Sequence, residues 1–215
     1  MTLTSELREA EQSRRAKRDP ALTAKMDAAT RELAASGIVD KSLKVGEQAP
    51  DFNLPDVKGD TVSLSEALKD GPVVLSFYRG GWCPYCNIAL QHLQRHLPEF
   101  RAEGAQLITV SPQTPDASLS TAEKNALDFS VLSDTNNRVA REYGLVFTLP
   151  DSLRAMYSNP DGINLPATNS SDSFELPVAA TYVIAKDSRV AYAFANADYT
   201  LRAEPDEIIK ALAAL

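Results

Sequence analysis

The sequence predicts an α/β layered fold with a helical arm at its N-terminus. Short apolar runs, typical of buried strands, alternate with stretches of helical periodicity from residue 45 onward. Residues 1–44 show helical patterning alone. The chain has 215 residues, of which 44% are hydrophobic and 24% charged, as is usual for globular proteins. We therefore expect an arm at 1–44 and one domain at 45–215, with an insertion at about 150–177.

The arm is predicted from a capping pattern followed by helical spacing. Asp19-Pro20 resembles an N-cap followed by proline at the first helical position, and Gly37 fits the helix end. Apolar residues between them fall on one helical face: Leu22, Met26, Ala29 and Leu33. A second, weaker helix is expected through Leu3 and Leu7. The apolar face of the arm leads us to expect a homodimer.

The remaining elements follow from apolar runs and turn residues. Strands are predicted at Phe52–Leu54 and Thr61–Leu64 (a hairpin), Pro72–Tyr78, Ala105–Val110, Ser130–Ser133, Thr181–Ala185 and Arg189–Phe194. Helices are predicted at Pro84–Ala102 with a kink at Pro98, Ser118–Leu127, Asn137–Tyr143, Leu149–Tyr157 and from Pro205 onward. The insertion after Leu149–Tyr157 is expected to be a long loop.

Composition excludes several classes of function. The net charge of −7 disfavours nucleic acid as a partner, because an acidic surface repels phosphates. No apolar run approaches the roughly 20 residues that span a bilayer, so no membrane association is expected. The first twenty residues lack the features of a signal peptide, so the expected location is the reducing cytoplasm. No nucleotide-binding motif is present, and we expect no cofactor.

Both cysteines lie in one motif, Trp82-Cys83-Pro84-Tyr85-Cys86, which follows a predicted buried strand and begins a helix. Two sulfurs at this spacing can close a small disulfide. The partial positive charge of a helix N-terminus favours thiolate over thiol. Arg79 lies just upstream and adds a positive charge. The motif therefore predicts a redox-active dithiol beside an exposed helix start.

Three other interpretations of the cysteines are weaker. A structural disulfide closing so short a loop would contribute only about 2 kcal/mol and would suit a reducing compartment badly. A zinc site would need His92 and His96, but helical geometry places them about 9 and 15 Å along the axis from Cys86. We expect these histidines on the polar side of the helix and no metal site. Two inert buried cysteines are disfavoured by the CxxC spacing.

Several segments resemble the alkyl hydroperoxide reductase / thiol-specific antioxidant (AhpC/TSA) family, in its peroxiredoxin-like branch with CPxC. They are Val45–Leu54, the active-site segment PVVLSFYRGGWCPYC (Pro72–Cys86), Ser111–Pro115, Val131–Asp134, Pro177–Ile184 and Asp198–Pro205. The resemblance implies a thioredoxin-like fold with a central mixed sheet flanked by helices. It also implies reduction of a hydroperoxide by Cys83 and Cys86, with an external dithiol such as thioredoxin restoring the pair.

The resemblance is incomplete at the site. Ordinary peroxiredoxins use Pro-xxx-Thr-xx-Cys and a distant arginine. When the two patterns are aligned at the end of the predicted strand Pro72–Tyr78, the peroxiredoxin cysteine falls at Cys86 and the threonine at Cys83. The proline then falls at Arg79 and the distant arginine near Ala179. The usual hydroxyl and guanidinium are therefore missing, and Arg79 is the candidate replacement for the guanidinium.

Aligned as a thioredoxin instead, Cys83 becomes the exposed nucleophile and Cys86 the resolving thiol. Thioredoxins also place a cis-proline where this chain has Ala179, so we predict a trans bond at Val178–Ala179. We expect Trp82, Pro84, Tyr85 and Ala179 to shape the approach to the sulfurs.

Three hypotheses of function follow. The first is the thiol-dependent peroxide reductase just described. The second is a disulfide or quinone-type reductase with Cys83 as nucleophile, which the thioredoxin-like WCPYC motif favours. The third is a non-catalytic redox-sensing module that binds a partner through the arm and the insertion. We favour the first.

Overall fold

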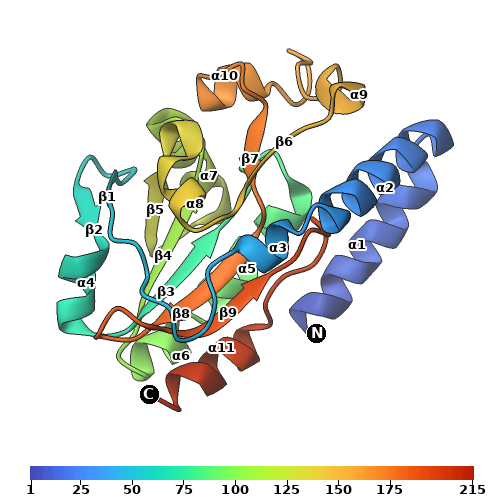
Figure 1. Cartoon of the computed structure of the whole chain (residues 1–215). Helices are drawn as coiled ribbons and strands as arrows, with labels where there is room; N and C mark the ends of the chain where they lie inside the picture. The colour runs from blue at the N-terminus through green and yellow to red at the C-terminus, as the bar shows by residue number, and fades with distance from the viewer.

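The computed structural model describes residues 1–215, and a five-stranded mixed sheet forms its centre (Figure 1). The strand order is β5-β4-β3-β8-β9. The bounds are β3 Val73–Phe77, β4 Gln106–Ser111, β5 Ser130–Ser133, β8 Ala180–Ile184 and β9 Val190–Ala195. β3, β4 and β5 run parallel, whereas β8 and β9 are antiparallel to their neighbours. The mixed sheet expected from the resemblance is confirmed, and each predicted strand lies within one or two residues of its observed position.

Alternation along β3 divides the core into two layers. Val73, Leu75 and Phe77 face one hydrophobic cluster, and Val74 faces the other. The first face is covered by α3 (Ile38–Lys41), α4 (Leu64–Asp70), α8 (Arg138–Glu142) and the predicted hairpin, β1 (Asn53–Pro55) with β2 (Thr61–Ser63). The second face is covered by α1 (Leu3–Lys17), α5 (Pro84–Arg95), α6 (Leu97–Ala102), α7 (Pro115–Asn125) and α11 (Pro205–Leu212). A 3-10 turn, η1 (Thr135–Asn137), precedes α8.

The arm consists of α1, α2 (Pro20–Ala35) and the short α3, and the two long helices lie side by side (Figure 1). Asp19 caps α2 by accepting hydrogen bonds from Ala21 N and Leu22 N, as the sequence predicts. Leu3 and Leu7 are buried against the second face of the sheet. The N-terminus of α1 is held by Glu204, whose carboxylate accepts from Leu3 N and Thr4 N.

The arm packs onto its own domain rather than presenting a free apolar face. Met26 is buried, and Leu22 and Ala29 pack beside it against a third cluster formed with residues of the insertion. Leu33 packs against the first layer of the core. The observation that suggested a homodimer is therefore explained within one chain, and the dimer stays a prediction.

Two elements differ from the sequence prediction. The helix predicted over Pro84–Ala102 is two helices, α5 and α6, separated at His96, and Pro98 lies in the first turn of α6. The insertion contains more regular structure than a long loop. Its α9 (Asp151–Arg154) lies within the predicted helix Leu149–Tyr157, but the expected loop holds α10 (Leu165–Asn169) and β7 (Glu175–Pro177), which pairs with β6 (Val146–Thr148). None of the helices combines the length and apolar composition needed to cross a bilayer.

Candidate active site

The loop between β3 and α5 places both cysteines at the start of α5. Cys83 is the N-cap of this helix, Pro84 occupies its first turn, and Cys86 follows within the same turn. Gly80 has a φ of +146°, and a Cβ there would lie 2.4 Å from Trp82 Nε1, so only glycine fits. Gly81 N donates to Gln113 Oε1 at 2.8 Å, which holds the loop against the start of α7.

The expectation that the cysteines lie at an exposed helix start is wrong. Cys83 is 1% exposed and Cys86 is fully buried, although α5 begins where the sequence predicts. Segments distant in the sequence pack around the start of α5: α1 lies along this helix, with Glu11 accepting a hydrogen bond from Tyr85 Oη, and Arg202 lies against Cys86. Helical periodicity identifies α1 but does not indicate where it docks.

Cys86 lies in a cationic pocket that the sequence analysis did not assign. Arg202 Nη2 donates to Cys86 Sγ at 3.0 Å, and Arg202 is itself buried. Arg202 Nη1 also donates to the carbonyl oxygens of Tyr199 and Leu201, at 2.8 and 2.6 Å, which fixes the guanidinium in place. A guanidinium held against a buried sulfur stabilises the thiolate form of that sulfur.

The two thiols have opposite pKa shifts. Burial alone would raise the pKa of Cys86, but the hydrogen bond from the Cys83 thiol, the charge of Arg202, and the backbone N–H and charge of Arg79 together lower it well below its ordinary value. Burial raises the pKa of Cys83, and its hydrogen bond to Cys86 and the negative charge of that sulfur raise it further. The surroundings therefore favour the thiolate form at Cys86 and the thiol form at Cys83.

Arg79 is buried among aromatic rings. Its Nη2 donates to Tyr157 Oη at 2.8 Å, while its Nε–H has no acceptor. Its guanidinium carbon lies 5.1 Å from the ring centroid of Trp82, 5.8 Å from that of Tyr157 and 5.2 Å from that of Tyr199. Arg79 therefore contributes charge and a backbone hydrogen bond near Cys86, whereas the direct side-chain donor to the sulfur is Arg202.

The predicted substrate-shaping residues occupy different places. Trp82 is half-buried and packs edge-on against Tyr157 with ring centroids 5.4 Å apart. Pro84 is half-buried at the helix start, and Tyr85 is buried. Ala179 is buried immediately before β8, and the Val178–Ala179 bond is trans, as predicted.

His92 does not lie on the polar side of α5, which corrects the sequence prediction. Its side chain is 3% exposed, and its Nε2 lies 2.8 Å from a carboxylate oxygen of Glu6 in α1. The pKa of Glu6 is lowered mainly by this hydrogen bond. His92 therefore joins α5 to the arm through a buried polar contact.

Three site residues lie outside the motif that sequence reasoning used. Arg202, Tyr199 and Tyr157 are brought to the cysteines by the fold. Arg202 and Tyr199 lie in Asp198–Pro205, a segment that the family resemblance marked without assigning a role. That segment contains a single arginine, which was the available signal. No sequence pattern pointed to Tyr157 as a site residue.

Comparison with known protein sequences identifies the family. A model of the AhpC/TSA family matches residues 45–193. The chloroplastic peroxiredoxin Q of Triticum aestivum is 35% identical over 115 residues, covering 54% of this chain and 52% of that protein. Peroxiredoxin Bcp of Escherichia coli K12 is 31% identical over 103 residues, covering 48% of this chain and 65% of that protein. The match thus spans about half to two thirds of these relatives' length.

Solved structures show the same fold. The crystal structure of peroxidoxin BcpB from Mycobacterium tuberculosis is similar with a TM-score of 0.63 and 26% identity, over 80% of this chain and 98% of that chain. A reduced 2-Cys peroxiredoxin of Plasmodium vivax is similar with a TM-score of 0.62 at 18% identity, over 80% of this chain and 81% of that chain. Because the family model covers more than half of its residues, this chain belongs to the AhpC/TSA family.

Proposed function

We propose that this protein is a thiol-dependent peroxide reductase in which Cys86 attacks the peroxide and Cys83 resolves the product. The observation that carries the proposal is the hydrogen bond from Arg202 Nη2 to Cys86 Sγ at 3.0 Å. It favours an anionic sulfur, the form that attacks a peroxide bond. Membership of the AhpC/TSA family and similarity to peroxiredoxins Q and Bcp support the same reaction.

The proposed cycle has three balanced steps. The Cys86 thiolate attacks one oxygen of ROOH, the O–O bond breaks, and the leaving alkoxide takes a proton to give ROH while Cys86 becomes a sulfenic acid. The Cys83 thiol then attacks that sulfur, forming the disulfide and releasing water. An external dithiol such as a thioredoxin reduces the disulfide and is itself oxidised. We further propose a cytoplasmic setting, where such dithiols are kept reduced.

Trapping with dimedone tests the assignment of the two cysteines. Each single-cysteine variant, Cys83→Ser and Cys86→Ser, is treated with one equivalent of hydroperoxide in the presence of dimedone, and the adduct is located by peptide mass spectrometry. We expect an adduct on Cys86 in Cys83→Ser and none on Cys83 in Cys86→Ser. The wild type should instead form the intramolecular disulfide. An adduct confined to Cys83, or peroxide reduction no faster than that of a free thiol, would reject the proposal.

The disulfide-reductase hypothesis rests on the CxxC motif at a helix start. It requires a low-pKa Cys83, but the pKa of this thiol is raised. Reduction of insulin by dithiothreitol decides between the two enzymes. We expect the protein not to accelerate insulin reduction, and acceleration that is lost in Cys83→Ser would favour the reductase instead.

A further inference from the structure

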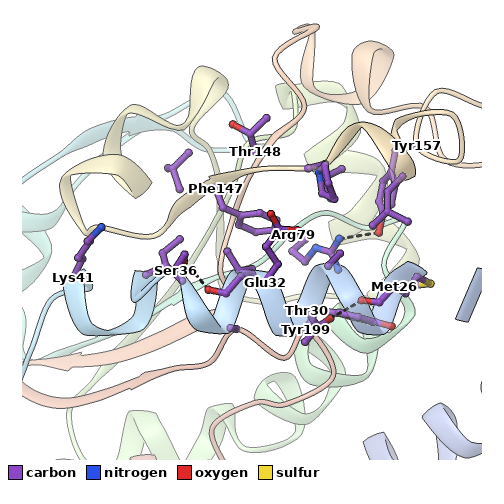
Figure 2. Close-up of a pocket in the computed structure, with 18 of the residues that line it drawn as sticks. Met26, Thr30, Glu32, Ser36, Lys41, Arg79, Phe147, Thr148, Tyr157 and Tyr199 are labelled. Atoms are coloured by element: carbon purple, nitrogen blue, oxygen red, sulfur yellow. Dashed lines mark hydrogen bonds between the residues drawn. The ribbon is translucent and has the colours of Figure 1, made fainter. Parts of the chain in front are cut away.

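A cavity of about 550 Å³ lies between α2, the segment from β6 to α9, and the loop after β9 (Figure 2). This volume falls in the range of small-molecule sites. Its wall is mainly apolar and includes Met26, Leu33, Phe147 and Leu153. Neither cysteine nor Arg202 lines the cavity, so a molecule bound there does not contact the sulfurs. The cavity is therefore a candidate ligand site separate from the reacting atoms.

One buried cation lines this cavity without a carboxylate partner. Arg79 is 4% exposed and forms no salt bridge within the chain. Its only side-chain hydrogen bond goes to the neutral hydroxyl of Tyr157, as Figure 2 shows, and its Nε–H is buried without an acceptor. The surrounding aromatic rings attract the cation but offer no oxygen to this N–H. Because a buried charge and an unpaired buried donor both cost free energy, an anion that accepts from Arg79 would be bound favourably.

The charges of the lining also favour an anion. The chain as a whole carries a net charge of −7, yet the lining holds three cationic residues, Lys41, Arg79 and Arg141, and one acidic residue, Glu32. Arg141 is exposed and pairs with Glu175, and Lys41 is exposed. Arg79 is thus the buried cation of the lining that has no carboxylate. A carboxylate is the anion that best fits it, because its two oxygens match the parallel N–H donors of a guanidinium.

The remaining wall fits a hydrocarbon group. Ala29, Leu33 and Phe147 line the cavity and are only partly buried by protein, so a hydrocarbon group bound there would remove apolar surface from water. Ala29 and Leu33 lie on α2, outside the residues 45–193 that match the family model. This wall is therefore a feature of this chain that the family match does not include.

We propose that the cavity binds an organic carboxylate, whose oxygens accept hydrogen bonds from Arg79 and whose hydrocarbon body lies between α2 and Phe147. The occupant is a ligand, and none of its bonds is made or broken. The charge of Arg79 also acts on both sulfurs, so the bound carboxylate and the Cys86 thiolate share one guanidinium and each weakens the other. In the reductase proposed above, the ligand would therefore inhibit the first step, a consequence that rests on the proposed function.

Calorimetric titration of the reduced protein tests the class of ligand. The probes are 4-phenylbutyrate and octanoate, each compared with its uncharged primary amide. We expect at least one acid to bind about tenfold or more tightly than its amide, because only the acid makes a charge-assisted hydrogen bond with Arg79. Binding of one acid alone identifies an aromatic or an aliphatic body for the same site. Binding of neither acid, or equal binding of acid and amide, would overturn the inference.

Two matched pairs of variants locate the ligand. Ala29→Trp places an indole in the cavity, and Ala28→Trp is its control at an exposed position of the same helix. Arg79→Gln and Lys41→Gln each remove one positive charge from the lining. We expect Ala29→Trp and Arg79→Gln to weaken binding of the acid about tenfold or more, and the two controls to stay within about threefold.

The placement fails if either expectation is reversed. Full binding in a folded Ala29→Trp, or loss of binding in Lys41→Gln with full binding in Arg79→Gln, would overturn it. Ala29→Leu is a smaller change in case the indole prevents folding, and it should weaken binding in the same direction.

The link to the cysteines has its own test. Cys86→Ser carries no negative charge at this position, so it should bind the acid about fivefold or more tightly than the reduced wild type does, at a pH where Cys86 is a thiolate. Reciprocally, saturating acid should move the acid limb of Cys86 alkylation by iodoacetamide toward higher pH in the wild type but not in Ala29→Trp. Equal affinities with an unmoved limb, or slower alkylation at every pH with the limb in place, would overturn the link.

These measurements are independent of peroxide reduction. If the wild type binds the acid as expected but reduces no peroxide, only the proposed function fails. If it reduces peroxides but binds neither acid, only the carboxylate site fails.

Discussion

At the scale of single residues, the site depends on which groups lie against Cys86. A buried thiolate costs free energy unless donors compensate for the lost water, and here the compensation comes from Arg202, the Cys83 thiol and the backbone of Arg79. Because the pKa of Cys86 is lowered, the thiolate is present on the alkaline side of that pKa and is lost only as pH falls through it. The reactive form should thus persist to lower pH than the thiolate of an ordinary cysteine.

Replacing Arg202 should raise the pKa of Cys86. A charge-assisted hydrogen bond is worth about 1.5–3 kcal/mol, which corresponds to about one to two pH units in the pKa of Cys86. In Arg202→Gln, the acid limb of the pH–rate profile for alkylation of Cys86 by iodoacetamide should therefore move about one to two pH units toward higher pH. Arg189→Gln, whose side chain is 62% exposed, serves as the control and should leave the limb in place. The profile is read by peptide mass spectrometry at Cys86, and an unchanged limb in Arg202→Gln would show that the guanidinium does not hold the thiolate.

The Cys83 thiol should also assist the first step as a hydrogen-bond donor to Cys86. Cys83→Ser keeps a donor at this position and Cys83→Ala removes it. We expect sulfenic acid formation in Cys83→Ser to stay within a few-fold of the wild-type rate, and in Cys83→Ala to slow by about tenfold or more, the equivalent of about 1.4 kcal/mol. Rapid-quench trapping with dimedone measures both. Equal rates in the two variants would limit Cys83 to resolving the sulfenic acid.

At the scale of elements, a buried polar contact joins α1 to α5. Glu6 accepts from His92, which is buried, and from Arg95, whose side chain is 57% exposed. Glu6→Ala leaves the imidazole without its partner and should lower the free energy of unfolding by about 1–3 kcal/mol in urea titrations. Arg95→Ala should cost less than about 1 kcal/mol, as surface pairs do.

Acid provides an independent check on the same contact. Because the folded-state pKa of Glu6 is lowered, its contribution is present above the unfolded pKa of about 4.3 and is lost as pH falls through the folded value. The stability difference between wild type and Glu6→Ala should therefore shrink on acidification below about pH 4. A difference that stays constant across this range would show that His92 gains nothing from the carboxylate.

The sequence predicts most elements because their signals are local. The apolar run of β3 and the Asp19-Pro20 cap of α2 can be identified without tertiary information. In contrast, β6 and β7 have three residues each and exist only because they pair, so no periodicity identifies them. His92 follows Tyr85 and Ala89 at helical spacing, but only tertiary packing shows that α1 covers this face and supplies Glu6.

At the scale of the whole molecule, one close contact between the arm and the domain lies at Gly144. Its φ is +70°, and a Cβ there would lie 2.3 Å from the carbonyl oxygen of Lys41 at the end of α3. Gly144→Ala should therefore lower the free energy of unfolding by more than about 2 kcal/mol, since the left-handed backbone alone costs an L-residue roughly 1–2 kcal/mol. Gly59→Ala, with φ +91° and no atom near its Cβ, should cost only that strain. Equal losses in urea titrations would show that the approach of Lys41 is not tight.

The whole fold also explains why the site could be predicted only in part. The CxxC motif lies within five residues, so the sequence identifies both sulfurs. Arg202 lies 116 residues from Cys86 and reaches it only because the segment after β9 passes the start of α5. Similarly, α1 packs along α5 although it precedes the cysteines by more than 60 residues. The sequence motif therefore identifies the two sulfurs, whereas only the folded chain shows which groups surround them.

Trp82 adjoins Cys83 in the sequence, touches the ring of Tyr157 and lies under the guanidinium of Arg79. It is the single tryptophan of the chain. Its intrinsic fluorescence therefore comes from one indole next to the reacting sulfurs, and a nearby thiolate, sulfenic acid or disulfide should each quench the emission differently. Every stage of oxidation and recharging can thus be followed optically, in real time, with unlabelled protein.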